Sequence, residues 1–310
     1  MKVVFMGSPD FAVPALQAVL ERHEVCLVVT QPDKRAGRGK KITACAVADF
    51  ARSRDLPLLQ PQSAKKAEFA KTLAATGAEV GIVVAYGKIL PPAVLAAFPH
   101  GCLNIHASIL PELRGAAPIQ WSILREHRET GVSIMMLDEG MDTGPVFAVE
   151  RIPIKATETS GELFERLAPL GAKLLLEVLE SLSDGKTKPI PQEHAEATYA
   201  PMLKKSDGQI DWCKSATEVS AKIRGVDPWP GAFTDFLGGR LKVFGATVIE
   251  KAGKAGELLS LEGESVDVGC GQDAVRIQEV QAAGKKRMKA AEFFKTRQIG
   301  LGTILGQENT

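Results

Sequence analysis

The amino-terminal stretch MKVVFMGSPDFAVPALQAVLERHEVCLVVT, residues 1–30, decides the fold that the sequence predicts. Its short valine-rich runs, at residues 3–5 and 25–30, are typical of buried strands. Between them, apolar residues at helical spacing cover residues 11–20. A strand, a helix and another strand in this order favour a parallel sheet that is covered by helices.

Further segments continue this alternation along the chain. Apolar runs at residues 80–84, 102–105 and 132–137 predict more strands. Helical spacing at residues 44–54 and 67–75 predicts helices between the earlier ones. The first part of the chain therefore predicts an α/β, Rossmann-like domain with a mostly parallel sheet and helices on both faces. Leucines at helical spacing over residues 163–182 predict one more helix, which packs on this sheet.

A turn with a single glycine follows the first predicted strand. Its sequence, GSPDFA at residues 7–12, lacks the second and third glycines of the GxGxxG pattern of dinucleotide sites. Pro9 and Asp10 are instead typical of the start of a helix. We therefore expect no dinucleotide cofactor.

The last third of the chain has a different pattern. A segment rich in proline and charge comes first, a helix is predicted over residues 217–224, and Gly238-Gly239 predicts a tight hairpin. SVDVGCGQDAVRIQEV, residues 265–280, alternates apolar and polar residues, which indicates strands. Several short strands with turn signals predict a small β-barrel. The expected organisation is a first domain at residues 1–189, a linker at 190–207 and a second domain at 208–310.

Composition limits the classes of protein to which the chain can belong. Its 310 residues correspond to about two domains of typical size. No apolar run is long enough to cross a bilayer, and the first residues lack the apolar stretch of a signal peptide. Five scattered cysteines without a CxxC pair fit free thiols in the cytoplasm. A formal net charge of +1 means that any RNA contact has to be local.

Three polar side chains indicate the chemistry. Asn104 and His106 alternate along the strand-like run CLNIH, so both point to one face. Asp142 follows the predicted strand at residues 131–137 and lies between Gly140 and Gly144. Open α/β sheets place their sites at such strand ends. An imidazole that binds a proton near neutral pH, beside an amide that donates to a carbonyl oxygen, indicates acyl transfer.

Simpler interpretations compete with this one. A histidine on a strand is often a structural, hydrogen-bonded residue, and we assign that role to His23, His100, His127 and His194. The acidic trio Asp138, Glu139 and Asp142 suggests a metal, but no second ligand cluster lies near it in the sequence, so no metal is expected. The GxSxG motif of a nucleophilic serine is absent, so Ser108 is expected to form hydrogen bonds within its loop.

Several motifs together resemble the 10-formyltetrahydrofolate-dependent formyltransferase family. They are CLNIHASILP at residues 102–111, SILPELRGAAPIQ at 108–120 and GVSIMMLDEGMDTG at 131–144. Within the family, the branch that formylates methionyl-tRNA is the most similar, on the basis of TQPDKRAGRGKK at 30–41, VVAYGKILP at 83–91 and GAAPIQ at 115–120. The similarity extends from the first predicted strand to Gly300 and covers nearly the whole chain.

The resemblance implies a role for each matching residue. Asn104, His106 and Asp142 would be catalytic, with 10-formyltetrahydrofolate as co-substrate and no metal. The residues expected to bind the folate are Tyr86, Gly87, Ile89, Leu90, Ser108, Ile109, Leu110, Pro111, Asp138 and Gly140. The acceptor would be initiator methionyl-tRNA, and the small barrel would be an OB-like tRNA-binding domain. The protein is expected to be a cytoplasmic monomer that does not bind membranes.

Two basic clusters are candidates for the RNA contact. The first lies in a glycine-containing stretch, which predicts a long, mobile, positively charged loop, and consists of Lys34, Arg35, Arg38, Lys40 and Lys41. The second consists of Lys285, Lys286, Arg287 and Lys289. A charge run is usually a solvated face, but the resemblance assigns both clusters to tRNA binding. The residues expected to contact tRNA are Arg38, Lys40, Lys41, Lys285, Lys286 and Arg287.

Other functions are compatible with the same motifs. The superfamily also contains 10-formyltetrahydrofolate hydrolase modules, which transfer the formyl group to water, and formyltransferases that act on other amines. A folate- or RNA-binding protein without catalysis is a third alternative, although the Asn, His and Asp set would then have no role. Glu112 departs from the resemblance, since some relatives carry a basic residue after the SxLP stretch.

Overall fold

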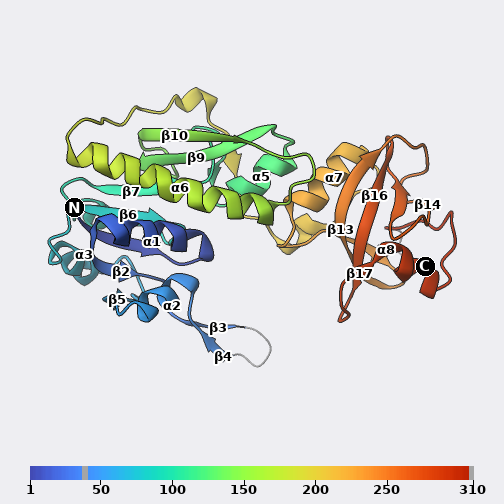
Figure 1. The fold of residues 1–310 in the computed structure, drawn as a ribbon, viewed down its shortest axis with the longest axis horizontal. Coiled ribbons are helices and arrows are strands. Elements are labelled where there is room, and N and C mark those ends of the chain that lie inside the picture. Colours follow the sequence, from blue (N-terminus) through green and yellow to red (C-terminus); the bar gives the residue numbers. More distant parts are fainter. Residues whose placement is uncertain (37–40, 307–310) are drawn as a thin grey trace. The chain divides into compact units, whose positions relative to one another are not determined.

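The computed structural model describes residues 1–36 and 41–306, which form two compact units. The first unit comprises Met1–Gly115, Thr130–Ile152 and Phe164–Ala200 and is built on a seven-stranded sheet (Figure 1). In the order β10-β9-β7-β6-β1-β2-β5, the strands are Val146–Pro153, Glu129–Met136, Cys102–His106, Val80–Val84, Lys2–Gly7, Glu24–Val29 and Leu58–Leu59. Every residue of β6 and β7 is buried, so these strands lie inside the unit.

The core of this sheet is parallel. β1 pairs in parallel with β2 on one side and with β6 on the other, and β5 and β7 continue the parallel pairing outward. At the far side of this sheet, β9 pairs with β7 in the antiparallel direction. The prediction of a mostly parallel sheet is therefore confirmed. Because the chain leaves β1 toward β2 and later returns to β6, the strand order reverses beside β1, and open sheets bind ligands beyond the carboxyl ends of strands near such a reversal.

Helices cover both faces of this sheet, as predicted. On one face, Val4 and Met6 of β1 share an apolar cluster with Phe69 of α3. On the other face, Gly171 of α6 lies so close to β7 that an added Cβ would come within 2.7 Å of the Ile105 side chain. The helices of this unit are α1 Val13–Arg22, α2 Ala46–Ser53, α3 Ala67–Ala74 and α4 Pro92–Leu95, and α6 Ser160–Ser183 belongs to it from Phe164 onward.

The basic stretch of residues 34–41 is not one continuous loop. Lys34–Ala36 (β3) and Lys41–Thr43 (β4) pair as antiparallel strands, with Arg35 opposite Ile42. The expected long loop is therefore wrong for these two ends, because strand pairing lets their backbone N–H and C=O groups bond to each other. Arg38 and Lys40 lie outside the described residues, and only the backbone of Lys41 is described.

The second unit is built on an antiparallel sheet (Figure 1). It comprises Ala116–Glu129, Pro153–Leu163 and the chain from Pro201 onward. The sheet has the order β12-β13-β16-β15-β14, with β17 beside β16, and these pairings are antiparallel. In that order, its strands are Phe233–Phe236, Gly239–Ile249, Ala274–Ala282, Val266–Gly269, Leu258–Ser260 and Met288–Lys289. Its helices are α5 Pro118–Leu124, α7 Ala216–Gly225 and α8 Ala290–Thr296. The curled antiparallel sheet confirms the predicted OB-like part of the fold.

The predicted hairpin of this sheet exists, displaced by one residue. Leu237 and Gly238 form its turn with φ angles of 50° and 70°, and Phe236 pairs with Gly239 as the first pair of the ladder. A two-residue turn with positive φ at both positions matches the twist of the strands that it joins. Gly238 therefore supplies the left-handed conformation, whereas Gly239 begins β13.

The segment expected to be a linker, residues 190–207, contains regular structure. Its His194–Glu196 turn is followed by β11, Tyr199–Ala200, which pairs in parallel with β8, Arg114–Gly115. The chain up to Ala200 belongs to the first unit. The domain boundaries at residues 189 and 207 stay a prediction.

Candidate active site

Asn104 and His106 lie on the same face of β7, near its carboxyl end. In the ladder with β9, Asn104 is opposite Met135 and His106 is opposite Ser133. Both side chains are buried, with exposed fractions of 9% for Asn104 and 5% for His106. The alternation in the sequence therefore predicted their common direction. Their place at a strand end in a parallel sheet is where such folds bind ligands.

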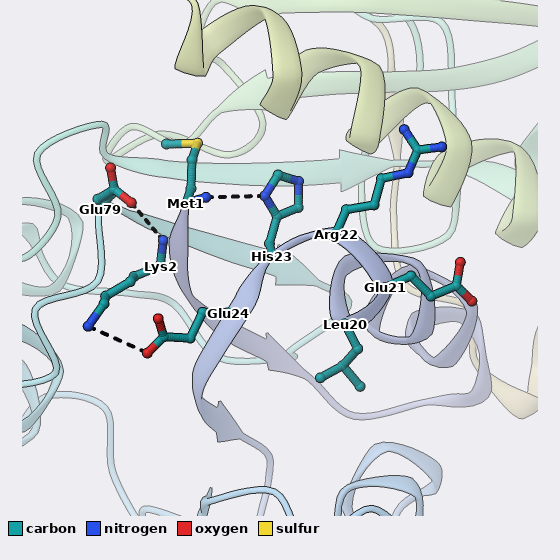
Figure 2. Close-up of a pocket in the computed structure, with 8 residues that line it drawn as sticks. All are labelled: Met1, Lys2, Leu20, Glu21, Arg22, His23, Glu24 and Glu79. Carbon is teal, nitrogen blue, oxygen red and sulfur yellow. Dashed lines mark hydrogen bonds and ion pairs between the residues drawn. The ribbon is translucent and has the colours of Figure 1, made fainter.

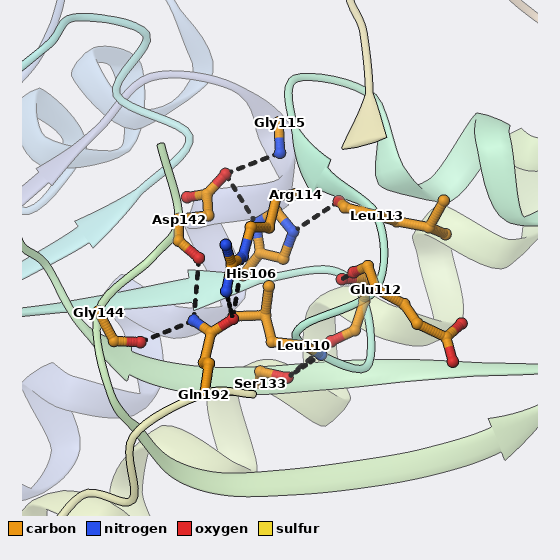
Figure 3. A network of polar contacts seen from close by, with 11 residues as sticks. His106, Leu110, Glu112, Leu113, Arg114, Gly115, Ser133, Asp142, Gly144 and Gln192 are labelled. Atoms are coloured by element: carbon orange, nitrogen blue, oxygen red, sulfur yellow. Dashed lines mark hydrogen bonds and ion pairs between the residues drawn. The ribbon is translucent and has the colours of Figure 1, made fainter. Parts of the chain in front are cut away.

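The imidazole of His106 is held between a carbonyl and a carboxylate (Figure 3). Its Nε2 lies 3.0 Å from the carbonyl oxygen of Leu113. A carbonyl oxygen only accepts, so Nε2 carries a proton and donates it. Its Nδ1 lies 3.7 Å from Oδ2 of Asp142, which is an ion-pair distance and too long for a hydrogen bond. A doubly protonated ring would thus direct one N–H at Leu113 and the other at the Asp142 carboxylate.

Asp142 occupies a tight turn after β9. Its backbone has a φ of 52°, in the left-handed region that aspartate tolerates better than most residues. Its Oδ2 accepts a hydrogen bond of 2.8 Å from the backbone N–H of Gly115. This bond fixes the carboxylate relative to the loop that also carries Leu113. The three predicted catalytic residues are therefore brought together, although 36 positions separate His106 from Asp142 in the sequence.

Asp138 and Gly140, two of the predicted folate residues, shape this turn. The Asp138 carboxylate accepts bonds of 2.7 and 2.8 Å from the Thr143 hydroxyl and one of 3.0 Å from the Gly140 N–H. A Cβ on Gly140 would lie 2.0 Å from the Thr143 hydroxyl, so only glycine fits there. Asp138 is thus committed to hydrogen bonds within the turn that presents Asp142.

The loop after β7 is closed by serine hydroxyls. Ser108 donates a 2.6 Å hydrogen bond to the carbonyl of Glu112, and Ser133 donates a 2.7 Å bond to the carbonyl of Ser108. The backbone N–H of Leu110 donates to the Ser133 hydroxyl at 3.1 Å. The expectation that Ser108 bonds within its loop is confirmed. Ile109 and Pro111 are partly exposed, whereas Leu110 is buried.

The loop after β6 presents backbone and one apolar side chain. Tyr86 is 1% exposed, and burial raises its pKa to about 12. Gly87 has a φ of 74°, and a Cβ there would come within 2.4 Å of the Gln31 side-chain nitrogen. Leu90 is buried, whereas Ile89 is 85% exposed. Of the predicted folate residues in this loop, Ile89 is therefore the side chain that is free to contact a ligand. Gly87 offers its backbone, whereas the Tyr86 carbonyl already accepts a 2.9 Å hydrogen bond from the Gln31 side chain.

Two buried residues that the sequence analysis missed complete the site (Figure 3). Arg114 is 2% exposed and donates to the side-chain oxygen of Gln192 at 3.0 and 2.7 Å. Gln192 in turn donates to the backbone carbonyls of Asp142 and Gly144. Arg114 lies within a motif that carried the family resemblance, but Gln192 lies in a proline-rich segment and has no local signal.

A surface hollow of about 530 Å³ lies elsewhere on the first unit (Figure 2). It is lined by residues that precede or begin β1, β2 and β6, among them Met1, His23 and Glu79. The Met1 amine lies 3.4 Å from Nδ1 of His23. Burial lowers the pKa of His23, and the positive amino terminus lowers it further. This hollow is at the amino ends of the parallel strands, the end where such sheets do not place their sites.

The second predicted basic cluster lies on the turn after β16. Lys285 and Lys286 are exposed there. Arg287 instead pairs with Glu279 and stacks on the Phe244 ring, 3.9 Å from its centroid. Arg287 is exposed as well, but its charge is paired, so the two lysines are the members of this trio that are free to bind phosphate.

Neither metal ligands nor membrane spans stand out in residues 1–36 and 41–306. No group of three or more histidine, cysteine or carboxylate side chains is arranged there to hold a metal ion. Among the helices of the same residues, none combines the length and apolar character that crossing a bilayer requires. All five cysteines are free thiols.

Comparison with known proteins decides the family. Residues 1–179 match the family model described as formyl transferase, and residues 202–298 match the one described as formyl transferase, C-terminal domain. The chain belongs to the formyltransferase family. This formyltransferase is 45% identical over 311 residues to the methionyl-tRNA formyltransferase of Sorangium cellulosum, covering 99% of this chain and 100% of that protein.

One further relative is also a methionyl-tRNA formyltransferase, and a solved structure shares the fold. The methionyl-tRNA formyltransferase of Lachnospira eligens is 42% identical over 315 residues, covering 99% of this chain and 100% of that protein. Among solved structures, HypX from Aquifex aeolicus in complex with tetrahydrofolic acid is 21% identical, with a TM-score of 0.65. That match covers 97% of this chain but only 48% of HypX, so the chain spans about half of HypX. The likeness to HypX concerns the fold alone.

Proposed function

We propose that the protein transfers a formyl group from 10-formyltetrahydrofolate to the amino group of methionine on initiator methionyl-tRNA. The observation that carries the proposal is the meeting of Asn104, His106 and Asp142 at one strand end in a chain of the formyltransferase family. Its relatives over the full length are methionyl-tRNA formyltransferases, which supports methionyl-tRNA as the acceptor.

Asn104 is suited to stabilise charge on the formyl oxygen. Within the described part of the chain, its side-chain amide forms no hydrogen bond, although the residue is only 9% exposed. An N–H donor without a protein partner does not have to break a protein hydrogen bond when negative charge develops on the carbonyl oxygen. Losing one such donor typically costs about a hundredfold or more in rate.

His106 and Asp142 supply the second donor and the proton acceptor. When the His106 ring is doubly protonated, the 3.7 Å gap between its Nδ1 and Oδ2 of Asp142 leaves Nδ1–H without a close hydrogen-bond acceptor, so it can donate to the formyl oxygen. The Asp142 carboxylate, 17% exposed, accepts the proton that the attacking amine releases. The carbon–nitrogen bond to methionine forms first and places the negative charge on the formyl oxygen. The carbonyl then re-forms as the bond to the folate nitrogen breaks, and that nitrogen takes up a proton.

The folate is expected to lie against the loops after β6 and β7. The exposed Ile89 and the partly exposed Ile109 and Pro111 offer an apolar surface beside backbone polar groups, which suits a flat pterin ring. Ser108 and Asp138 support the proposal indirectly, since their hydrogen bonds hold the two loops in shape.

The tRNA contacts are expected at exposed basic residues of both units. Lys285 and Lys286 are exposed on the turn after β16, and the β3-β4 pairing holds the ends of the first basic stretch. Phosphate recognition by lysine and arginine is local and does not need a large net charge. A reaction on charged tRNA also favours the cytoplasm, where free thiols persist. We expect a monomer, which light scattering would test.

A formylation assay tests the proposal directly. Purified protein is mixed with 10-formyltetrahydrofolate and either initiator or elongator methionyl-tRNA, and the fate of the formyl group is followed. We expect transfer to the methionine of initiator tRNA. Release of formate into water at the same rate without tRNA would instead support a hydrolase. Transfer only to small amines or sugars would place the enzyme in another branch of the family.

A further inference from the structure

Gln192 makes a complete set of hydrogen bonds beneath the Asp142 turn (Figure 3). Its side-chain nitrogen donates to the backbone carbonyls of Asp142 at 2.9 Å and Gly144 at 2.7 Å. Its side-chain oxygen accepts from Nε and Nη2 of Arg114 at 3.0 and 2.7 Å. A carboxamide has two donor hydrogens and one oxygen with two lone pairs, so Gln192 is fully paired. The residue is 8% exposed, which excludes water from most of these bonds.

Arg114 fixes the orientation of this carboxamide. A carboxamide can rotate by about 180° and so exchange the places of its oxygen and nitrogen. An arginine only donates hydrogen bonds, so the oxygen of the carboxamide has to be the end that faces Arg114. The flipped form would direct the oxygen at the carbonyls of Asp142 and Gly144, where it would find no donor. Arg114 also lies 3.1 Å from Nδ1 of His194 and, among the described residues, pairs with no carboxylate. Burying a guanidinium that bonds only to neutral groups costs desolvation free energy, which argues that the position of Arg114 serves the function of the protein.

The segment that begins at Gln192 also holds the loop that carries Leu113 and Arg114. The Thr198 hydroxyl accepts a 2.9 Å bond from the N–H of Leu113, and the Thr198 carbonyl accepts one of 2.9 Å from the N–H of Arg114. Leu113 binds His106 through its carbonyl, and Gly115 binds the Asp142 carboxylate through its N–H. Residues 192–200 therefore support the backbone of residues 113–115, whose Leu113 carbonyl positions the His106 imidazole and whose Gly115 N–H positions the Asp142 carboxylate.

We propose that Gln192 is a positioning residue for the reaction, which holds the Asp142 turn in register with His106, and that Arg114 sets the orientation of its carboxamide. Asp142 has a left-handed backbone, which few residues adopt without support from their surroundings. The two bonds from Gln192 grip this turn at Asp142 and Gly144, on either side of Thr143. This inference rests on the proposed function, because it takes Asp142 as the proton acceptor.

The test compares kcat and KM for variants that keep or lose the grip on the turn. Gln192→Leu removes all four hydrogen bonds, and Gln192→Glu keeps the acceptor for Arg114 but loses both donors. Both should lower kcat about tenfold to a hundredfold, because a displacement of about 1 Å at a reacting group has that effect. The KM values for folate and tRNA should change by less than about threefold, because neither variant touches a substrate. Should Gln192→Leu fail to fold, Gln192→Glu, which is nearly the same shape, carries the test.

A double-mutant cycle with Asp142→Asn separates positioning from general stability. If Gln192 acts through Asp142, then adding Gln192→Leu to Asp142→Asn should cost less than about twofold further in kcat. Gln60→Leu is the matched control. Gln60 donates its carboxamide to Thr30, Gln31 and Asp33 in the same unit, away from the turn. Its kcat should stay within about twofold of the unchanged protein even if its melting temperature falls.

The outcomes distinguish this inference from the proposed function. A Gln192→Leu loss that multiplies fully with that of Asp142→Asn, or a Gln192→Glu variant with unchanged kcat, would overturn the positioning role. Normal turnover in Asp142→Asn would instead overturn the proposed role of Asp142, and absence of transfer by the unchanged protein would overturn the proposed function itself.

Discussion

Replacing Asp142 tests the proposed chemistry most directly, provided that catalysis is separated from stability. Asp142→Asn keeps the size of the side chain, an oxygen that accepts from the Gly115 N–H, and a residue type that tolerates a φ of 52°. It removes only the charge and the capacity to take a proton. We therefore expect a change in the free energy of unfolding below about 1 kcal/mol and a fall in kcat of about a hundredfold or more.

Asp142→Ala perturbs the same site differently. It loses a charge-assisted hydrogen bond of 2.8 Å, worth about 2 kcal/mol, and places alanine in the left-handed region, which costs about 1 kcal/mol more. A destabilisation of about 3 kcal/mol should lower the melting temperature by about 6–12 °C for a unit of this size. The two variants should thus share the loss of kcat but differ clearly in thermal stability.

The assay is steady-state formylation of initiator methionyl-tRNA at saturating 10-formyltetrahydrofolate, with thermal melts of the same preparations. The KM for tRNA should stay within about threefold, since the carboxylate acts in the transition state. Near-normal turnover by Asp142→Asn together with an unchanged melt would refute the assignment of Asp142 as the proton acceptor.

Three further predictions concern RNA, metal and pH. Changing Lys285 and Lys286 to alanine should weaken tRNA binding and leave the folate dissociation constant unchanged. The slope of the logarithm of tRNA affinity against the logarithm of salt concentration should become shallower by about 0.7 to 0.9 per lost phosphate contact. The same change at the exposed pair Lys65 and Lys66 removes equal charge and is the control, and an equal effect there would contradict a specific contact. Formyl transfer to a small amine should survive chelation, because Asn104 and His106 supply hydrogen-bond donors to the formyl oxygen, and activity that chelation abolishes and zinc restores would show this to be wrong. Burial lowers the pKa of His23 below 6.5, so the stability that its neutral form contributes is present above pH 6.5 and is lost as the pH falls through the lowered pKa. His23→Gln should therefore flatten the decline of the melting temperature on acidification. An unchanged pH profile of the melting temperature would exclude His23 as a source of acid sensitivity.

The sequence by itself determined the parts of this protein that depend on local periodicity. Alternating strands and helices predicted the mostly parallel sheet, since residues one or a few positions apart settle which face of each element is apolar. The period of two along β7 also predicted that Asn104 and His106 share a face. Motifs that resemble the formyltransferases added Asp142 to this pair, and they predicted the family to which the chain belongs.

Only the tertiary structure decided how these groups are held. Gln192 accepts a hydrogen bond from Arg114 and donates one to Asp142, which lie 78 and 50 positions away, and no local pattern reports contacts of that separation. The protonated nitrogen of His106 depends on the carbonyl of Leu113, which faces it only once the loop after β7 has folded back. The charges and glycines of the basic stretch at residues 34–41 are typical of a loop, yet Lys34–Ala36 pairs with Lys41–Thr43 as strands. Pairing depends on backbone groups that every residue carries, so side-chain composition does not reveal it.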